Sequence, residues 1–424
     1  MKKKLLVILG AGSSIARGIP SVTAIDQHMS QWGKSWASLR GFPDYYGALA
    51  HEIETYYRSG PSGPRPSLNF EKVLGEMVAL SHWMTPAPWG DTLRQAACNG
   101  AHPPNIHFPN PSFSDYAPYG PTQMLKDQLQ YLLTALVQHM RSFCQNLNLT
   151  NHPASQYNAL FDGLREAFDI GVYNLNYDTA ALAACPGAYT GFSADGGFEQ
   201  NGIHARNEWG FVYHLHGSVH YSLVGEFGNE IRWKKDLTGA FFDGHQGLSG
   251  DKRSEGRSFP KTTLIAGGFK LDQLLVEPFH SFHAALVRHV YAADAILIGG
   301  YGFTDVHINR ALRNRLAGSG EKLPVLVLDR AGDRTDPMAF RYDPWTYELC
   351  SALHASGSFF FEPGHSSPPI PSELAARGAF EVSAPHRVAI WYGGFGEVAT
   401  RLDGIVPWLN GQTDEVLASA FPAL

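Results

Sequence analysis

The chain has 424 residues, of which 44% are hydrophobic, and a formal net charge of −6. This length allows one large domain or two with a substantial core, and no apolar run is long enough to cross a bilayer. The negative charge argues against extensive contact with nucleic acid, because phosphate binding needs a basic face. The four cysteines are far apart and form no C-x-x-C pair, so neither a zinc ribbon nor a disulfide framework is predicted.

The first predicted element is a buried strand, residues 5–9, that ends in the glycine-rich turn GAGSS at 10–14. The preceding lysines mimic a signal peptide, but the apolar stretch is too short and no cleavage-type sequence follows, so we expect a cytoplasmic protein. Glycines after a strand bring backbone N–H groups up to a pyrophosphate, and a Cβ there would hold the anion away. The same turn also fits an ordinary strand-to-helix connection, because the spacing is not a full G-x-G-x-x-G.

The next part of the chain is predicted to be mainly helical. Apolar residues at spacings of three and four predict helices over residues 22–60, 68–83, 122–149 and 154–168. Residues 84–121 are rich in Pro, Asn and His and predict a long surface excursion.

Short apolar strands then alternate with helices, a pattern that predicts a doubly wound parallel sheet. The strands are expected at residues 168–175, 211–215, 263–266, 295–299 and 324–328, and the helices at 272–292 and 305–317. Residues 223–262 are polar and Gly-rich and predict a mobile loop, with the basic cluster at 232–235 on a solvated hairpin. The tail, residues 333–424, is weakly patterned and has one strand-like run at 387–392.

Three motifs stand where strands are expected to end. They are YNLNYDT at 173–179, HLHGSVH at 214–220 and LIGGYGFTDVHINRAL at 297–312. Ligands bind at the carboxyl ends of strands in an open parallel sheet, so Asn176 and His216 are expected to converge on a cavity beside the glycine-rich turn. His214 shares a face with His216 but lies deeper in the strand, so a structural role is expected for it.

These motifs resemble, in order, those of sirtuin-type NAD-consuming domains. The matching segments are GAGSSIARGIPS, NYD at 176–178, HLHGS at 214–218 and IGGYGFTD at 298–305. The similarity spans about residues 1–330 and is in particular to the bacterial sirtuin-like domains of antiphage defence systems. It implies an α/β fold, with a Rossmann-like parallel sheet, a large helical insertion after strand one and no zinc ribbon. Residues 1–21 and 169–332 would form the NAD-binding core, 22–168 the helical module, and 333–424 a C-terminal extension offering an oligomer or partner surface.

The resemblance also implies roles for individual residues. His216 resembles the family histidine that acts as general base, and Asn176 the asparagine that orders water and the nicotinamide-side ribose. The residues expected to bind NAD⁺ are Gly10, Ala11, Gly12, Ser13, Ser14, Ile19, Pro20, Asp178, Gly217, Gly299, Gly300, Tyr301, Asp305 and Asp329. In this set residues 10–13 would hold the diphosphate, Gly300, Tyr301 and Asp305 the adenosine side, and Asp329 a ribose. Asp305 fits equally well as the N-cap of the helix that it begins.

The sequence departs from the sirtuin deacylases at several points. It has no cysteine pairs for their zinc module, Ser21-Val22 replace their acidic-aromatic-arginine run, and the 40 residues from Asn176 to His216 exceed their usual spacing. These departures favour an NAD⁺ glycohydrolase (NADase) that releases nicotinamide and ADP-ribose, or a cyclic relative, with no metal. The alternatives are a regulatory module that binds NAD or ADP-ribose without turnover and, third, an NAD-dependent protein deacylase.

The resemblance finally implies a biological setting. The expected role is an effector of antiphage defence that depletes NAD⁺ in the bacterial cytoplasm and causes abortive infection. Such an activity needs control, which implies a homo-oligomer and a separate sensor subunit. A HerA-family ATPase is the first expected partner and a short Argonaute the second, whereas neither direct nucleic-acid binding nor a membrane is expected.

Overall fold

The computed structural model describes residues 2–15, 17–59, 68–84, 121–146, 152–225, 230–245, 261–265, 274, 276–318, 322–330, 343–355 and 370–412. Its centre is a seven-stranded sheet with the strand order β10-β11-β9-β8-β1-β2-β3. In chain order the strands are β1 (Lys3–Leu9), β2 (Phe168–Asn174), β3 (Phe211–His214), β8 (Ala295–Gly299), β9 (Val325–Leu328), β10 (Phe380–Ser383) and β11 (Val388–Trp391). Neighbouring strands are parallel except β10 and β11. The predicted α/β class with a Rossmann-like parallel sheet is confirmed.

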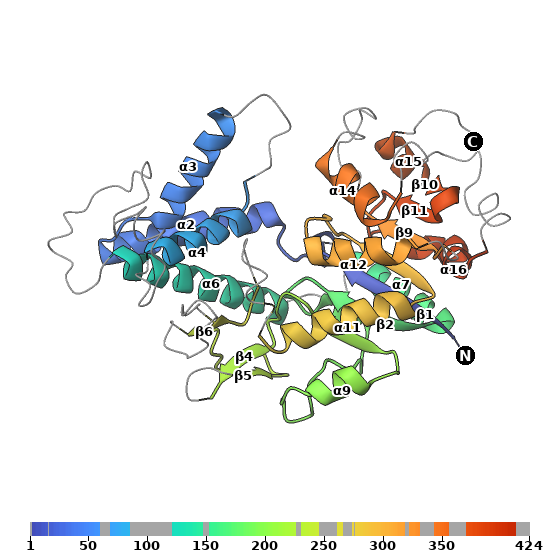
Figure 1. Ribbon diagram of the computed structural model, residues 1–424, viewed down its shortest axis with the longest axis horizontal. Helices are drawn as coiled ribbons and strands as arrows, with labels where there is room; N and C mark the ends of the chain where they lie inside the picture. The colour runs from blue at the N-terminus through green and yellow to red at the C-terminus, as the bar shows by residue number, and fades with distance from the viewer. Residues whose placement is uncertain are drawn as a thin grey trace.

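Helices cover both faces of this sheet (Figure 1). They are α7 (His152–Ala167), α8 (Ala180–Ala184), α11 (Phe279–Ala292), α12 (Val306–Leu316), α14 (Pro344–Ala352), α15 (Pro371–Arg377) and α16 (Leu402–Leu409). Along β1, Leu6 and Ile8 pack on the face of α11 and α12, whereas Leu5, Val7 and Leu9 pack on the face of α7 and α16. An unbroken apolar run is what a parallel strand covered on both faces requires.

The strand order reverses between β1 and β8. From β1 the order runs through β2 and β3 toward one edge, and β8 and β9 lie on the other side of β1. The loops that follow β1 and β8 therefore leave the sheet next to each other, at the position where open α/β sheets form a ligand crevice.

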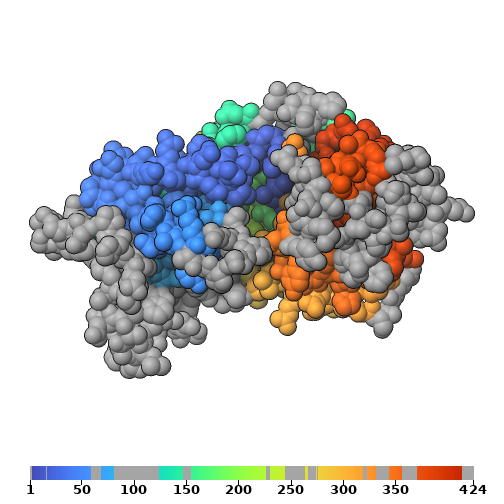
Figure 2. Space-filling view, turned by 90° about the horizontal axis from the view of Figure 1, so that it is seen from above, coloured from blue at the N-terminus to red at the C-terminus, as the bar shows by residue number. Residues whose placement is uncertain are grey.

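The predicted helical insertion after β1 forms a module whose helices pack in a third hydrophobic cluster, which Tyr177, Val219 and Leu264 also join. Its helices are α2 (Val22–Arg40), α3 (Tyr45–Ser59), α4 (Phe70–Met84) and α6 (Pro121–Gln145). Met29, Leu74, Met77 and Leu129 are among the side chains buried between them. The module lies beside the sheet (Figure 1), and the space-filling view shows a hollow between the two lobes (Figure 2).

The stretch predicted to be helical, residues 22–60, contains two helices, α2 and α3. Gly41 ends α2 in the left-handed conformation, with φ 65°, and its N–H donates to the carbonyl of Ala37. Glycine adopts this conformation without a steric penalty, so it allows the chain to turn into α3. The remaining predicted helices agree in place, although α11 begins at Phe279 instead of residue 272.

Within residues 221–265, the strands that the structure describes form two small antiparallel pairs beneath the helical module instead of joining the main sheet (Figure 1). β4 (Tyr221–Val224) pairs with β5 (Glu230–Trp233), which confirms a hairpin at the basic cluster, and β6 (Gly244–His245) pairs with β7 (Lys261–Thr262). The strand predicted at 263–266 in the parallel sheet is therefore wrong. Leu264 instead makes an isolated bridge to Gly217.

The C-terminal part contributes more to the sheet than its weak pattern predicted. β11 is the predicted strand-like run, and it pairs in parallel with β9, while β10 adds an antiparallel edge. Shorter helical segments are α1 (Ala11–Ile15), α9 (Gln200–Ala205), η3 (Ala384–His386) and η4 (Val398–Arg401). The surface excursion predicted at 84–121 falls almost wholly outside the described residues. Among the helices that the structure describes, none is long and apolar enough to span a membrane.

Candidate active site

A cavity of about 350 Å³ lies at the carboxyl ends of the central strands, against the helical module. This volume is within the range of small-molecule sites. Eleven of the residues predicted for the site line it: Gly10, Ala11, Ser14, Ile19, Pro20, Asn176, Asp178, His216, Gly300, Tyr301 and Asp305. The other five predicted residues do not belong to its lining: Gly12, Ser13, Gly217, Gly299 and Asp329.

The floor of the cavity is formed by the loops that follow β1 and β8, which pack backbone against backbone. The N–H of Gly10 donates to the carbonyl of Gly299 at 2.9 Å, and that of Gly12 to Gly300 at 2.9 Å. A Cβ on Gly10 would lie 2.6 Å from the carbonyl oxygen of Gly300, and one on Gly12 would lie 2.8 Å from its Cα. The immediate reason for glycine at these positions is thus the contact between two protein loops, whereas the sequence suggested an approaching anion.

Asn176 joins the loop after β2 to the loop after β1. Its Nδ2 donates to the carbonyl of Gly10 at 2.9 Å and to the hydroxyl of Ser14 at 2.8 Å, and it lies 3.2 Å from the hydroxyl of Ser13. The side chain is 8% exposed, so these bonds form in a largely dry environment and fix the amide firmly. Asn176 therefore lines the cavity and also holds the glycine-rich turn in place.

His214 supports Asn176 from below, in agreement with its predicted structural role. Its Nδ1 lies 3.1 Å from the carbonyl oxygen of Asn176, to which the neutral ring donates. Burial lowers the pKa of His214 to about 3. The ring is accordingly neutral at physiological pH.

This buried imidazole predicts a specific loss of stability in acid. In the unfolded chain His214 takes up a proton near pH 6.5, but in the folded protein only near pH 3. Stability therefore falls as pH falls through this window, by up to about 1.4 kcal/mol per pH unit for this group. His214→Gln should lose about 2 kcal/mol less stability than the wild type between pH 7 and pH 5, measured by urea unfolding.

The matched control for this measurement is His280→Gln, since the His280 side chain is 63% exposed. We expect its stability to follow the wild-type pH dependence. If the free energy of unfolding of His214→Gln falls between pH 7 and pH 5 as steeply as that of the wild type, the assignment of His214 as a buried neutral ring is contradicted.

His216 enters the cavity from the loop after β3 and meets Asp305 across it. Its Nε2 lies 3.0 Å from Oδ2 of Asp305, and the two side chains are 7% and 4% exposed. The other carboxylate oxygen of Asp305 accepts the backbone N–H of His307, so Asp305 is also the N-cap of α12, as the sequence allowed. One carboxylate thus fixes both the start of a helix and the orientation of the imidazole.

Asp178 supplies a second carboxylate at the cavity wall. It is fully buried, and its Oδ1 accepts the N–H of Ala180 at 2.8 Å. Its Oδ2 has no hydrogen-bond partner within the part of the chain that the structure describes. Burial raises the pKa of Asp178, and the nearby hydroxyl of Ser14 and guanidinium of Arg17 oppose that rise.

Residues of the helical module complete the cavity, which the sequence analysis did not predict. Asn69, Phe70 and Glu71, at the start of α4, line the wall together with Met140 of α6. No motif marks these residues, because their proximity to the strand ends arises only when the module packs against the sheet. Among the lining residues that the structure describes, three are acidic (Glu71, Asp178 and Asp305), and none is Lys or Arg.

Within the described ranges, no cluster of three or more His, Cys, Asp and Glu side chains could hold a metal ion. The chemistry that the cavity itself offers is that of one imidazole paired with a carboxylate, one fixed amide and further carboxylates. Such a set can position water, accept a proton and stabilise positive charge.

Solved structures and one family model are similar to this chain. A solved structure of a Sir2 homologue–NAD complex is 12% identical, with a TM-score of 0.38, and the match covers 97% of this chain and 91% of that one. A Sir2 homologue mutant bound to 2′-O-acetyl ADP ribose is 13% identical, with a TM-score of 0.35 and coverage of 77% and 80%. None of the curated proteins compared matches the chain significantly. Residues 171–343, which include Asn176, His216 and Asp305, match the family model of the SIR2-like domain.

Proposed function

We propose that the protein is an NAD⁺ glycohydrolase that cleaves the bond between nicotinamide and ribose. The observation that carries this proposal is that Asn176 and His216, 40 residues apart in the sequence, line one cavity at the point where the strand order reverses. The match of residues 171–343 to the SIR2-like domain supports NAD⁺ as the molecule bound there. Products would be nicotinamide and ADP-ribose or a cyclic relative.

The chemistry follows from these side chains. Nicotinamide leaves as a neutral molecule with the electron pair of the C–N bond, so little acid catalysis is required. The ribosyl centre becomes oxocarbenium-like, and water adds to it as the bond breaks. His216 accepts the proton that the water loses, and the carboxylate of Asp305 stabilises the resulting imidazolium. The Nδ2 of Asn176 is committed to the β1 loop, so its Oδ1 is the atom that would orient the water.

The direct test is release of nicotinamide from NAD⁺ by the purified chain, followed by chromatography, alone and with candidate partner subunits. Release that depends on His216 supports the proposal. If the chain binds NAD⁺ but releases no nicotinamide under any of these conditions, it is a nucleotide-binding regulatory module. Deacylation of an acetylated peptide that consumes NAD⁺ stoichiometrically would instead indicate a deacylase.

The acidic lining predicts a preference for the positively charged end of NAD⁺. Glu71→Gln should weaken binding of NAD⁺ roughly tenfold, because a carboxylate of the wall attracts the nicotinamide ring at moderate distance. Binding of ADP-ribose, which lacks that ring, should not change. The measurement is calorimetric titration of both ligands in a His216→Ala background, in which turnover is expected to be slow.

Glu76→Gln is the control for this test, since Glu76 lies on the same helix but is exposed and does not line the cavity. Equal losses of affinity for NAD⁺ and ADP-ribose in Glu71→Gln would contradict a role for Glu71 at the nicotinamide end.

We further propose that the activity serves antiphage defence by depleting NAD⁺. Support for this role comes from the resemblance of the four ordered motifs to the sirtuin-like domains of such systems. Cells that carry the protein with its genomic neighbours should lose NAD⁺ during phage infection, whereas cells with His216→Ala should not. Unchanged NAD⁺ in infected cells that are nevertheless protected would contradict depletion as the mechanism.

A further inference from the structure

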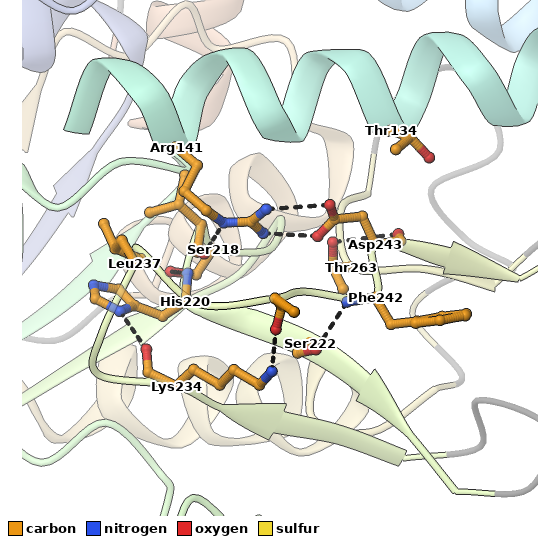
Figure 3. A network of polar contacts seen from close by, with 12 residues as sticks. Thr134, Arg141, Ser218, His220, Ser222, Lys234, Leu237, Phe242, Asp243 and Thr263 are labelled. Carbon is orange, nitrogen blue, oxygen red and sulfur yellow. Dashed lines mark hydrogen bonds and ion pairs between the residues drawn. The ribbon is translucent and has the colours of Figure 1, made fainter. Parts of the chain in front are cut away.

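Arg141 of α6 connects the helical module to the chain that follows His216 (Figure 3). Its Nε donates to the carbonyl of Val219 at 3.0 Å, and its two terminal nitrogens donate to the carboxylate of Asp243 at 3.1 and 2.7 Å. The two charged side chains are only 7% and 2% exposed. The guanidinium also lies 3.6 Å from the centre of the Phe241 ring. A bidentate ion pair of this kind fixes both the distance and the orientation of the groups that it joins.

From Asp243 a short path of backbone contacts leads to His216. The carbonyl of Asp243 accepts the N–H of Thr263 at 3.2 Å, and two residues later Ile265 donates to the carbonyl of His216 at 2.7 Å. Gly217 is packed so closely against this segment that a Cβ would lie 2.3 Å from the carbonyl oxygen of Thr263. Arg141 therefore reaches the loop that carries His216 from two sides, through Val219 and through residues 263–265.

We propose that Arg141, together with Asp243, is a positioning residue for His216, and this inference rests on the proposed NAD⁺ cleavage. The ion pair holds the loop that carries His216 in the position where the imidazole contacts Asp305. A buried ion pair contributes little net stability compared with an apolar pair of similar size, but it does impose geometry. The helix that carries Arg141 also supplies Met140 to the cavity wall. Arg141 therefore fixes the position of the helical module relative to His216, the proposed general base.

The test compares Arg141→Met, Arg141→Lys, Asp243→Asn and the double variant Arg141→Met/Asp243→Leu. Arg141→Met should lower kcat for NAD⁺ cleavage roughly 10- to 100-fold with little change in KM, because small displacements of a catalytic group have effects of this size. Arg141→Lys keeps the positive charge but cannot make the bidentate contact with Asp243. Its kcat should lie between those of Arg141→Met and the wild type. Arg232→Met is the matched control, since Arg232 is an exposed arginine on β5.

The double variant separates positioning from stability. It removes both charges, so its thermal stability should recover toward that of the wild type, while kcat should stay low. Recovery of kcat together with stability would overturn the proposal, because the pair would then act on the fold alone.

A second readout does not depend on turnover. The imidazole of His216, assigned by comparison with His216→Gln, is titrated by NMR in the wild type and in Arg141→Met. Loss of the contact with Asp305 should shift its titration midpoint to lower pH. An unchanged midpoint would overturn the proposal even if the wild type cleaves no NAD⁺, and a shifted one would uphold the positioning role in that case.

Discussion

Replacing His216 with alanine is expected to lower the rate of NAD⁺ cleavage by roughly 100- to 10,000-fold. The reason is that the imidazole is the group in the cavity best able to take a proton from water near neutral pH, and Asp305 holds it in place at 3.0 Å. The rate is measured as nicotinamide release at saturating NAD⁺, so that a small change in affinity does not contribute. The fold should persist, because His216 meets Asp305 at the cavity and is not part of a hydrophobic cluster.

Two further variants sharpen this prediction. Asp305→Asn keeps an oxygen that can cap α12 but removes the negative charge opposite His216, so kcat should fall less than in His216→Ala, while the helix remains. His280→Gln changes an exposed histidine that does not line the cavity, and its activity should remain within a few-fold of the wild type. Full turnover in His216→Ala would show that the general base has been wrongly assigned, even if the cavity cleaves NAD⁺.

The location of the site could be predicted because its main residues follow strands directly. β1, β2 and β8 are recognisable as apolar runs, and Asn176 and the glycines at 299–300 stand at their ends, where parallel strands bring them together. His216 is found by the same rule, two residues after β3. The predicted division of the chain into domains stays a prediction. It assigns residues 1–21 and 169–332 to a core, 22–168 to a helical module and 333–424 to a C-terminal extension.

The contacts between the module and the sheet could not be predicted in this way. Arg141 and Asp243 are 102 residues apart, and the sequence places each in an unremarkable setting, one on a helix and one in a polar stretch. Their pairing depends on how the helical module packs beside the sheet, which no local pattern encodes. Glu71 was missed for the same reason. β10 was missed because four residues are too short for a reliable period, and only pairing with β11 makes it a strand.

Glycine in the turn after β1 can be explained by two different physical reasons. Its sequence suggested that glycine is needed for an anion to approach, whereas the structure places the backbone of Gly300 and Tyr301 where a side chain on Gly10 would lie. The two reasons predict different results. Steric exclusion by protein acts in the absence of any ligand, but exclusion of an anion acts only on binding.

Gly10→Ala is therefore expected to lower the free energy of unfolding by about 3 kcal/mol in the absence of NAD⁺. The added Cβ would lie 2.6 Å from the carbonyl oxygen of Gly300 and 2.7 Å from Cα of Tyr301, and neither backbone atom can move without disturbing the β1–β8 contact. Strain from a left-handed conformation does not contribute, since Gly10 is not among the glycines with positive φ. Gly396→Ala is the control, because a Cβ there meets no atom within 4 Å. If urea unfolding of Gly10→Ala matches the wild type while NAD⁺ binding is lost, the anion and not the facing loop requires glycine at this position.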